Sequence, residues 1–177
     1  MNDEVMDCFF WLLQKRDAQM FQTGTSPSKK RHHFFHCFFY PMLKTSGYNS
    51  IKKWSDEVPG GDIFDLHKIF IPINASNVHW FLAVIDMEQK TIQAFDSWEG
   101  LKITRRKCLP VLKKYLEEEH LAKKGIPLCQ EEEWKLISNP YNEPPQQTNR
   151  KLLLLTSMML PVSFVSCCTY MYSFVLS

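Results

Sequence analysis

The sequence lacks a large excess of either charge, a pair of cysteines in CxxC spacing, and a basic leader at its start. Its formal net charge is only +2 over 177 residues, so we expect no nucleic-acid partner. Its six cysteines are not spaced for a zinc ribbon or a redox motif. Asn2, Asp3 and Glu4 stand where a signal peptide has basic residues. We therefore expect no signal peptide, mostly free thiols and a location in the nucleus or cytoplasm.

Charge is also missing from residues 152–177, whereas the chain before them has an ordinary mixed composition. Three interpretations of this tail are open: translated non-coding or frame-shifted sequence, a C-terminal membrane anchor, or a new core segment. The abrupt change favours the first. A span of ~20 apolar residues after Arg150 and Lys151 suits the second, although Pro161 and several hydroxyl residues count against it. A membrane partner is expected only if the tail is a genuine anchor.

Apolar periodicity predicts two helices. The first lies at the start of the chain, and its apolar stripe consists of Val5, Cys8, Phe9, Leu12 and Leu13. The second covers residues 105–119, with Leu109, Leu112 and Leu116 on one face and residues 117–119 facing water. Residues 22–30 are small and polar and predict a loop. We expect the aromatic stretch 34–43 to be buried, residues 34–35 and 37–40 to be strand-like, and Pro41 to end the strand-like part.

Alternating and continuous apolar runs predict strands at residues 68–73, 78–86, 91–96 and 134–137. The second and third are joined by a short polar turn and form an antiparallel hairpin. Pro72 places the first of these strands near an edge or a bulge. The length of 177 residues fits one domain of ordinary size.

The histidine-rich segment at residues 29–36 has a functional and a structural interpretation. Its basic part, residues 29–33, suits a binding arm or a nuclear-import signal, but a solvated loop is the favoured interpretation. His32, His33 and His36 form an HHxxH pattern. No carboxylate or cysteine accompanies them at helical spacing, so we expect no metal here.

The hairpin brings a histidine and a carboxylate together. His79 lies near the start of its first strand and Asp96 ends its second. A turn centred between Met87 and Glu88 places them directly opposite, and a turn one residue later leaves them a diagonal apart, still within reach. A carboxylate beside a histidine fixes the imidazole tautomer, which is the base and orienting half of a hydrolytic triad. A structural pair is the alternative, as a core aromatic is for Trp80.

Several blocks of the chain resemble successive motifs of the SUMO-specific cysteine proteases, which act on a ubiquitin-like modifier. The blocks are Asn2-Asp3-Glu4-Val5, Phe38-Phe39-Tyr40-Pro41, Lys68-Ile69-Phe70-Ile71-Pro72-Ile73, Val78-His79-Trp80, Phe95-Asp96-Ser97 and Pro145-Gln146-Gln147-Thr148-Asn149. The resemblance implies a papain-like, two-lobed α+β fold over residues 1–149, and hydrolysis of the peptide or isopeptide bond that follows the modifier's Gly-Gly tail.

The resemblance also implies a role for each matching residue. His79 is the expected general base, Asp96 orients it, and Gln147 donates its side-chain amide to the oxyanion hole. Trp80 is expected to cover the tunnel for the Gly-Gly tail, and Asp3 to lie on the surface that grips the modifier. SUMO or a SUMO-conjugated protein is the implied partner, and no cofactor or metal is expected.

The chain departs from the family where the nucleophile should stand. The family continues Asn-Gly-x-Asp-Cys-Gly, whereas here Asn149 is followed by Arg150, Lys151, Leu152 and Leu153. Leu153 occupies the position of the cysteine, and an aliphatic side chain forms no thiolate. We therefore expect an incomplete catalytic domain at residues 1–149, an unrelated tail at 150–177, and no hydrolysis by this sequence. The alternative function is a pseudoprotease that binds SUMO without cleaving it.

Overall fold

The structure is a computed structural model and describes residues 2–75, 79–96, 102–128 and 134–138. Gln147, Leu153 and the tail lie outside the described residues. The helices are α1 (Asp3–Gln22), α2 (Phe39–Ser46) and α3 (Lys102–Lys124), with short 3-10 turns η1 (Tyr48–Ser50), η2 (Lys52–Glu57) and η3 (Ile63–Asp65). The strands are β1 (His32–Phe34), β2 (Lys68–Ala75), β3 (His79–Asp86), β4 (Thr91–Phe95) and β5 (Lys135–Ile137).

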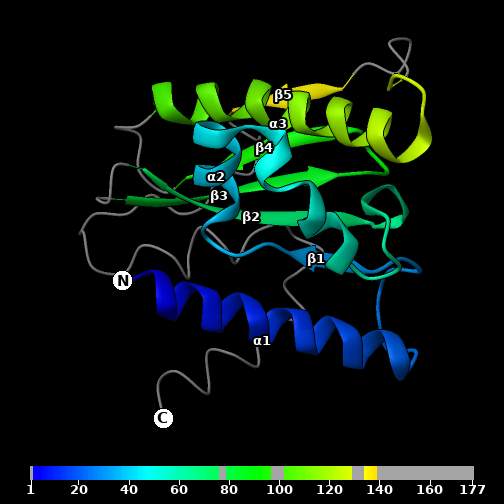
Figure 1. The fold of residues 1–177 in the computed structure, drawn as a ribbon. Helices are drawn as coiled ribbons and strands as arrows, with labels where there is room; N and C mark the ends of the chain where they lie inside the picture. Colours follow the sequence, from blue (N-terminus) through cyan, green and yellow to red (C-terminus); the bar gives the residue numbers. More distant parts are fainter. Residues whose placement is uncertain (1, 76–78, 97–101, 129–133, 139–177) are drawn as a thin grey trace.

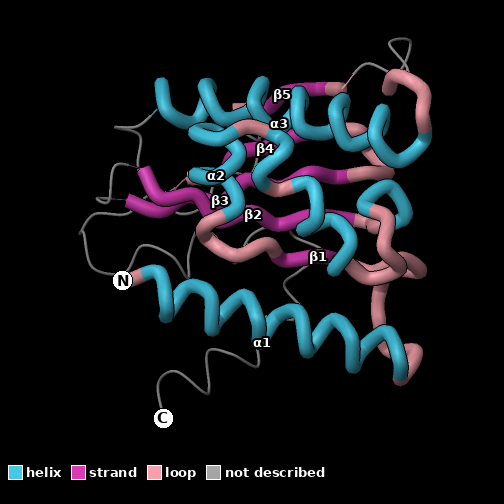
Figure 2. Tube along the Cα trace, in the orientation of Figure 1, coloured by secondary structure: helices cyan, strands magenta, loops and turns pink. Residues whose placement is uncertain are grey.

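The five strands form one mixed sheet in the order β1-β2-β3-β4-β5. The β2–β3 and β3–β4 pairs are antiparallel, and the two outer pairs, β1–β2 and β4–β5, are parallel. Helices lie around this sheet in Figures 1 and 2. The α+β class and the hairpin expected from the sequence are therefore confirmed.

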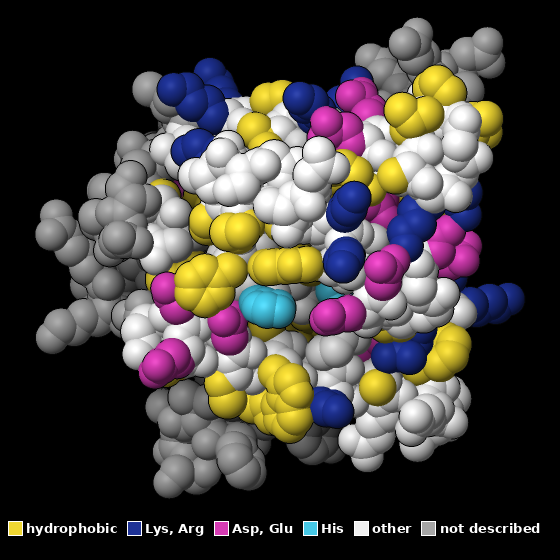
Figure 3. Space-filling model, viewed as in Figure 1, with side chains coloured by type: hydrophobic (Ala, Val, Ile, Leu, Met, Phe, Trp, Pro, Cys, Tyr) yellow, Lys and Arg dark blue, Asp and Glu magenta, His cyan; other side chains and the backbone are white. Residues whose placement is uncertain are grey.

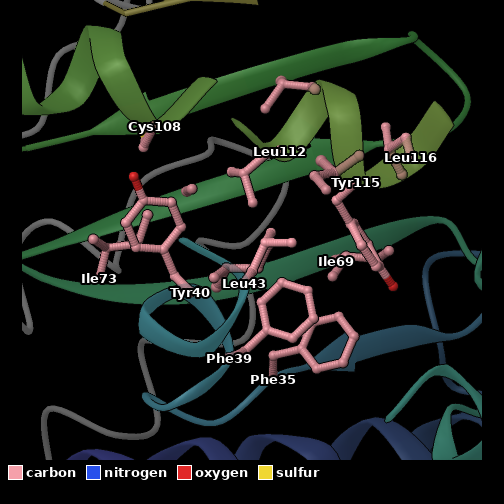
Figure 4. Close-up of a cluster of buried hydrophobic side chains, with 14 of the residues drawn as sticks. Phe35, Phe39, Tyr40, Leu43, Ile69, Ile73, Cys108, Leu112, Tyr115 and Leu116 are labelled. Carbon is pink, nitrogen blue, oxygen red and sulfur yellow. The ribbon is translucent and has the colours of Figure 1, made fainter. Parts of the chain in front are cut away.

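The sheet separates two apolar clusters, because successive residues of a strand point to opposite faces. On one face, side chains of β2, β3 and β4 pack against α2 and α3. Figure 4 shows part of this cluster, in which Leu112 and Tyr115 of α3 approach Phe39 and Leu43 of α2 over the same face of the sheet. On the other face, the cluster includes Met6 and Phe10 of α1. All eight residues of β3 are buried, as expected for a strand covered on both faces.

Helix α1 begins where the sequence predicted, but its packed face overlaps the predicted stripe only in part. The Asn2 side chain caps it by accepting a hydrogen bond from the Val5 N–H. Met6 and Phe10 are the buried apolar residues of α1. Phe9 and Leu13 of the predicted apolar stripe are partly buried against the same cluster, whereas Val5, Cys8 and Leu12 are exposed. The prediction of the helix is confirmed, and its packed face coincides with only part of the predicted stripe.

The aromatic stretch 34–43 is buried at most positions, but it is largely helical. β1 ends at Phe34, and α2 begins at Phe39. Residues 39–40 are therefore helical rather than strand-like, and Pro41 lies in the first turn of α2 instead of ending a strand. Proline is tolerated there because the first N–H groups of a helix have no partner within it.

Strand β2 explains the position of its proline. β1 pairs only with Lys68, Ile69 and Phe70 of β2, so Pro72 has a strand on one side, β3. A residue without an N–H fits such a local edge, as the sequence predicted.

Helix α3 is longer than predicted and ends at Lys124. Gly125 follows with a φ of 72° and donates its N–H to the Leu121 carbonyl. Leu109, Leu112 and Leu116 are buried, as expected. Glu119 was expected to face water but is fully buried. Its carboxylate accepts a hydrogen bond of 2.7 Å from the Tyr48 hydroxyl, which offsets part of the cost of burial. Within the described part of the chain, no helix has the length and apolar character needed to span a bilayer.

Candidate active site

The β3–β4 hairpin determines how His79 and Asp96 face each other. Leu82 pairs with Phe95, so the turn is centred between Glu88 and Gln89. This register leaves His79 and Asp96 a diagonal apart, the second of the two arrangements open from the sequence. Both side chains lie on the face of the sheet that α2 and α3 cover.

The two side chains are in direct contact. Nε2 of His79 lies 2.5 Å from Oδ1 of Asp96, and the exposed fractions of the two side chains are 2% and 0%. In the neutral ring, this contact favours the tautomer with its proton on Nε2. The other nitrogen, Nδ1, is then the atom that can accept a proton.

A third charged residue, Arg105, reaches the same carboxylate from the first turn of α3. Its Nε lies 3.6 Å from Oδ2 of Asp96, and its side chain is 5% exposed. Asp96 therefore lies between an imidazole on one oxygen and a guanidinium on the other. The sequence analysis did not single out Arg105; its only local signal is a basic residue at the positive end of a helix, where the dipole disfavours it.

Trp80 and Asp3 lie in different surroundings. Trp80 follows His79 in β3, so it points to the opposite face of the sheet, where it is 6% exposed in the cluster with Met6 and Phe10. Asp3 is the first residue of α1 and is partly exposed. In Figure 1 the start of α1 lies on the same side of the molecule as the start of β3. The tunnel and modifier-binding roles expected for these residues stay predictions.

The described cysteines differ sharply in environment. Burial, followed by the hydrogen bond to Asp7, raises the pKa of the Cys37 thiol to about 12. Burial also raises the pKa of the Cys108 thiol to about 12, and this thiol donates to the Arg105 carbonyl at 3.0 Å. Cys8 is exposed on α1. Neither buried thiol is an activated nucleophile, because activation requires a lowered pKa.

The histidine-rich segment is better ordered than a solvated loop. His32 is buried, and its Nδ1 lies 2.7 Å from Oδ1 of Asp17, while Arg31 Nε lies 2.8 Å from Oδ2. The favoured interpretation of a solvated basic loop was therefore wrong for Arg31 and His32. Over the described ranges, no cluster of three His, Cys, Asp or Glu side chains is arranged to hold a metal ion. Figure 3 shows basic and acidic side chains interspersed on the visible face.

Residues 1–150 match the Ulp1 protease family, C-terminal catalytic domain. The chain therefore belongs to this family, as the resemblance implied.

Two curated relatives and one solved structure illustrate the similarity. The chain is 36% identical over 149 residues to sentrin-specific protease 2 of Pongo abelii, covering 84% of this chain and 23% of that protein. It is 37% identical over 123 residues to human sentrin-specific protease 3, covering 70% of this chain and 18% of that protein. It also resembles the C-terminal Ulp1 protease domain solved in complex with Smt3, the yeast orthologue of SUMO. That match has a TM-score of 0.65 and 28% identity, and covers 94% of this chain and 66% of the other.

The chain matches only part of each curated relative. The chain spans about a quarter or less of the length of the two curated relatives. The fold class is confirmed by the Ulp1 structure. The activity, substrate and partners of this chain are matters for proposal.

Proposed function

We propose that residues 1–149 form the catalytic domain of a deSUMOylating cysteine peptidase whose base and orienting residue are His79 and Asp96. The observation that carries this proposal is the buried contact of 2.5 Å between His79 Nε2 and Asp96 Oδ1 in a chain of the Ulp1 family. A SUMO relative is the proposed partner, by analogy with the Ulp1–Smt3 complex. The nucleus or cytoplasm is the proposed location.

The chemistry follows from which ring nitrogen Asp96 engages. His79 Nδ1 accepts the proton of a cysteine thiol, and the thiolate attacks the carbonyl carbon of the last glycine of the modifier. Gln147 is proposed to donate its amide to the oxygen that becomes negative. The imidazolium then gives its proton to the departing amine, and water releases the modifier from the thioester with His79 again as base.

The sequence at the nucleophile position changes what this chain can do. Leu153 replaces the expected cysteine, so the proposal for the chain as given is binding of SUMO without hydrolysis. The segment 150–177 is proposed to be unrelated to the catalytic domain. The alternative is a pseudoprotease whose own role is to bind SUMO.

The test is capture of SUMO carrying an electrophile at its C-terminus. The chain as given should form no covalent adduct. The four substitutions Arg150→Gly, Leu152→Asp, Leu153→Cys and Leu154→Gly restore the family motif and should give a stoichiometric adduct. The same variant without Leu153→Cys is the matched control. Adding His79→Ala to the four substitutions should slow adduct formation by about 10²–10⁴-fold.

Binding is measured separately by titration of the unmodified chain with SUMO. Saturable binding without an adduct supports the proposed binding role. An adduct on the unmodified chain, mapped to Cys167 or Cys168, contradicts the assignment of position 153. A restored motif that binds SUMO yet reacts equally fast with and without His79 contradicts the assignment of the base.

A further inference from the structure

Arg105 supplies a second charged contact of Asp96, beside that of His79. Oδ1 of Asp96 meets His79 Nε2 at 2.5 Å, and Oδ2 lies 3.6 Å from Arg105 Nε. We propose that Arg105 is a positioning residue, whose charge holds the Asp96 carboxylate in the one orientation that presents Oδ1 to the imidazole.

The positive charge of Arg105 is destabilising at this place in the fold unless the carboxylate of Asp96 lies beside it. α3 begins at Lys102, so Arg105 lies in the first turn, near the positive end of the helix dipole, and no acidic residue lies in that turn. Its side chain is also 5% exposed, and a buried cation needs a counter-ion. Asp96 is the carboxylate in ion-pair contact with it.

The ion pair with Arg105 also stabilises the buried negative charge of Asp96. Its side chain has no exposed surface, so water contributes little to the stabilisation of its charge. A guanidinium beside Oδ2 offsets part of the cost of burying this charge. It also makes the two carboxylate oxygens inequivalent, since one faces a permanent cation and the other a titratable ring.

The consequence for His79 is a fixed tautomer. With Oδ1 held on Nε2, the proton of the neutral ring stays on Nε2 and the lone pair stays on Nδ1. If the carboxylate turns or is displaced, the Nδ1–H tautomer becomes accessible, and a ring in that form cannot accept a proton through Nδ1. Arg105 therefore acts on proton transfer through Asp96, without contact with a substrate.

This inference rests on the proposed function for the use of the His79–Asp96 pair in hydrolysis. The positioning itself can be measured on the unmodified chain, which needs no nucleophile. A failed SUMO-adduct assay therefore leaves this test intact, and a failed positioning test leaves the adduct assay intact.

The experiment is NMR of the full chain with ¹⁵N-labelled histidine at a pH where the rings are neutral, with His79→Gln to assign the signals. The wild type should show the Nε2–H tautomer of His79 and a downfield ring proton from the short contact with Asp96. Arg105→Gln should shift the tautomer ratio about tenfold toward the Nδ1–H form, the effect of losing one charge-assisted contact. Arg106→Gln removes the same charge from an exposed neighbour on α3 and should leave the signals unchanged.

A conservative variant covers the case in which Arg105→Gln does not fold. Arg105→Lys keeps the charge, so it should retain the Nε2–H tautomer and the downfield proton. A folded Arg105→Lys chain with mixed tautomers overturns the proposal whatever the Gln variant does. A folded Arg105→Gln chain with wild-type signals overturns it equally.

Discussion

Replacing Asp17 by asparagine should loosen helix α1 from the sheet. Asp17 lies in the C-terminal half of α1 and is buried, with Oδ1 2.7 Å from His32 Nδ1 and Oδ2 2.8 Å from Arg31 Nε. The His32 N–H also donates to both carboxylate oxygens at 3.3 Å. Asparagine keeps the volume of the side chain but removes its charge and one acceptor oxygen.

The expected loss follows from these contacts. A hydrogen bond to a charged group contributes about 1.5–3 kcal/mol, and removing one partner of a buried pair costs about 3–5 kcal/mol. The Arg31 side chain is 23% exposed, so the lower end applies. We expect Asp17→Asn to lower the free energy of unfolding by about 3 kcal/mol, against a total of about 5–15 kcal/mol for a domain.

Urea-induced unfolding followed by circular dichroism measures this loss, and Asp56→Asn is the matched control. Asp56 pairs with Lys123 at 2.5 Å, but its side chain is 62% exposed. A surface pair of this kind contributes about 0–1 kcal/mol. Equal losses for Asp17→Asn and Asp56→Asn would refute the claim that burial makes the Asp17 contacts strong.

The pH dependence gives a second check on Asp17. Burial raises the pKa of this carboxyl, but the hydrogen bonds from His32 and Arg31 outweigh burial and leave the pKa below its ordinary value of 3.8. The unfolded chain therefore binds the proton more readily, and the stability contributed by Asp17 is lost as pH falls below 3.8 toward the folded-state pKa. The difference between the wild type and Asp17→Asn should shrink over this range.

Two further predictions concern a histidine and the thiols. Burial, aided by the charge of His36, lowers the pKa of His33 from 6.5 to about 4. Between these two pH values, His33 is therefore protonated in the unfolded chain and neutral in the folded chain. The contribution of His33 to the free energy of unfolding, measured in urea, should fall by about 1–2 kcal/mol between pH 7 and 5. His33→Phe should remove this contribution and leave that of His67, whose pKa burial also lowers, whereas His120→Gln should keep it. An equal loss in the wild type and in His33→Phe would refute the assignment to His33. Brief exposure to iodoacetamide, followed by peptide mass spectrometry, should label the exposed Cys8 in the folded chain and leave Cys37 unlabelled until urea unfolds it. The reason is that burial raises the pKa of the Cys37 thiol to about 12. Equal labelling rates of the two thiols in the folded chain would contradict the burial of Cys37.

The sequence predicted the proximity of His79 and Asp96 but not the register of the hairpin. Two strand-like runs joined by a polar turn require the ends of the strands to meet. The structure has the later turn, and Asp86 stabilises it by accepting hydrogen bonds from the N–H groups of Glu88 and Gln89, at 3.1 and 2.9 Å. An aspartate that bonds the backbone two residues ahead favours this turn. That local signal could have decided between the two registers.

The packed face of α1 was harder to predict because its stripe is partly polar. Met6 and Phe10 continue along the helix into Gln14 and Asp17, and Gln14 exchanges hydrogen bonds with backbone groups of β1. A pattern of apolar residues gives these positions no weight, since their burial depends on partners in a strand that comes later in the chain. The competing stripe through Val5 is more apolar, yet Val5 and Leu12 are exposed and only Phe9 and Leu13 pack partly against the core.

Three charged residues that the sequence analysis passed over or, for Glu119, assigned to water share one property. Asp17, Arg105 and Glu119 are all buried, and each meets its partner in a different element of the fold: Asp17 in β1, Arg105 at the end of β4, and Glu119 in η1. A lone charged residue is mostly exposed, so sequence reasoning assigns it to water unless a partner is known. Each of these contacts joins a helix to another element of the domain, and a buried charge tolerates little displacement of its partner. The same reasoning makes Arg105 informative about function, because the element that it ties to α3 is the end of β4 that carries Asp96.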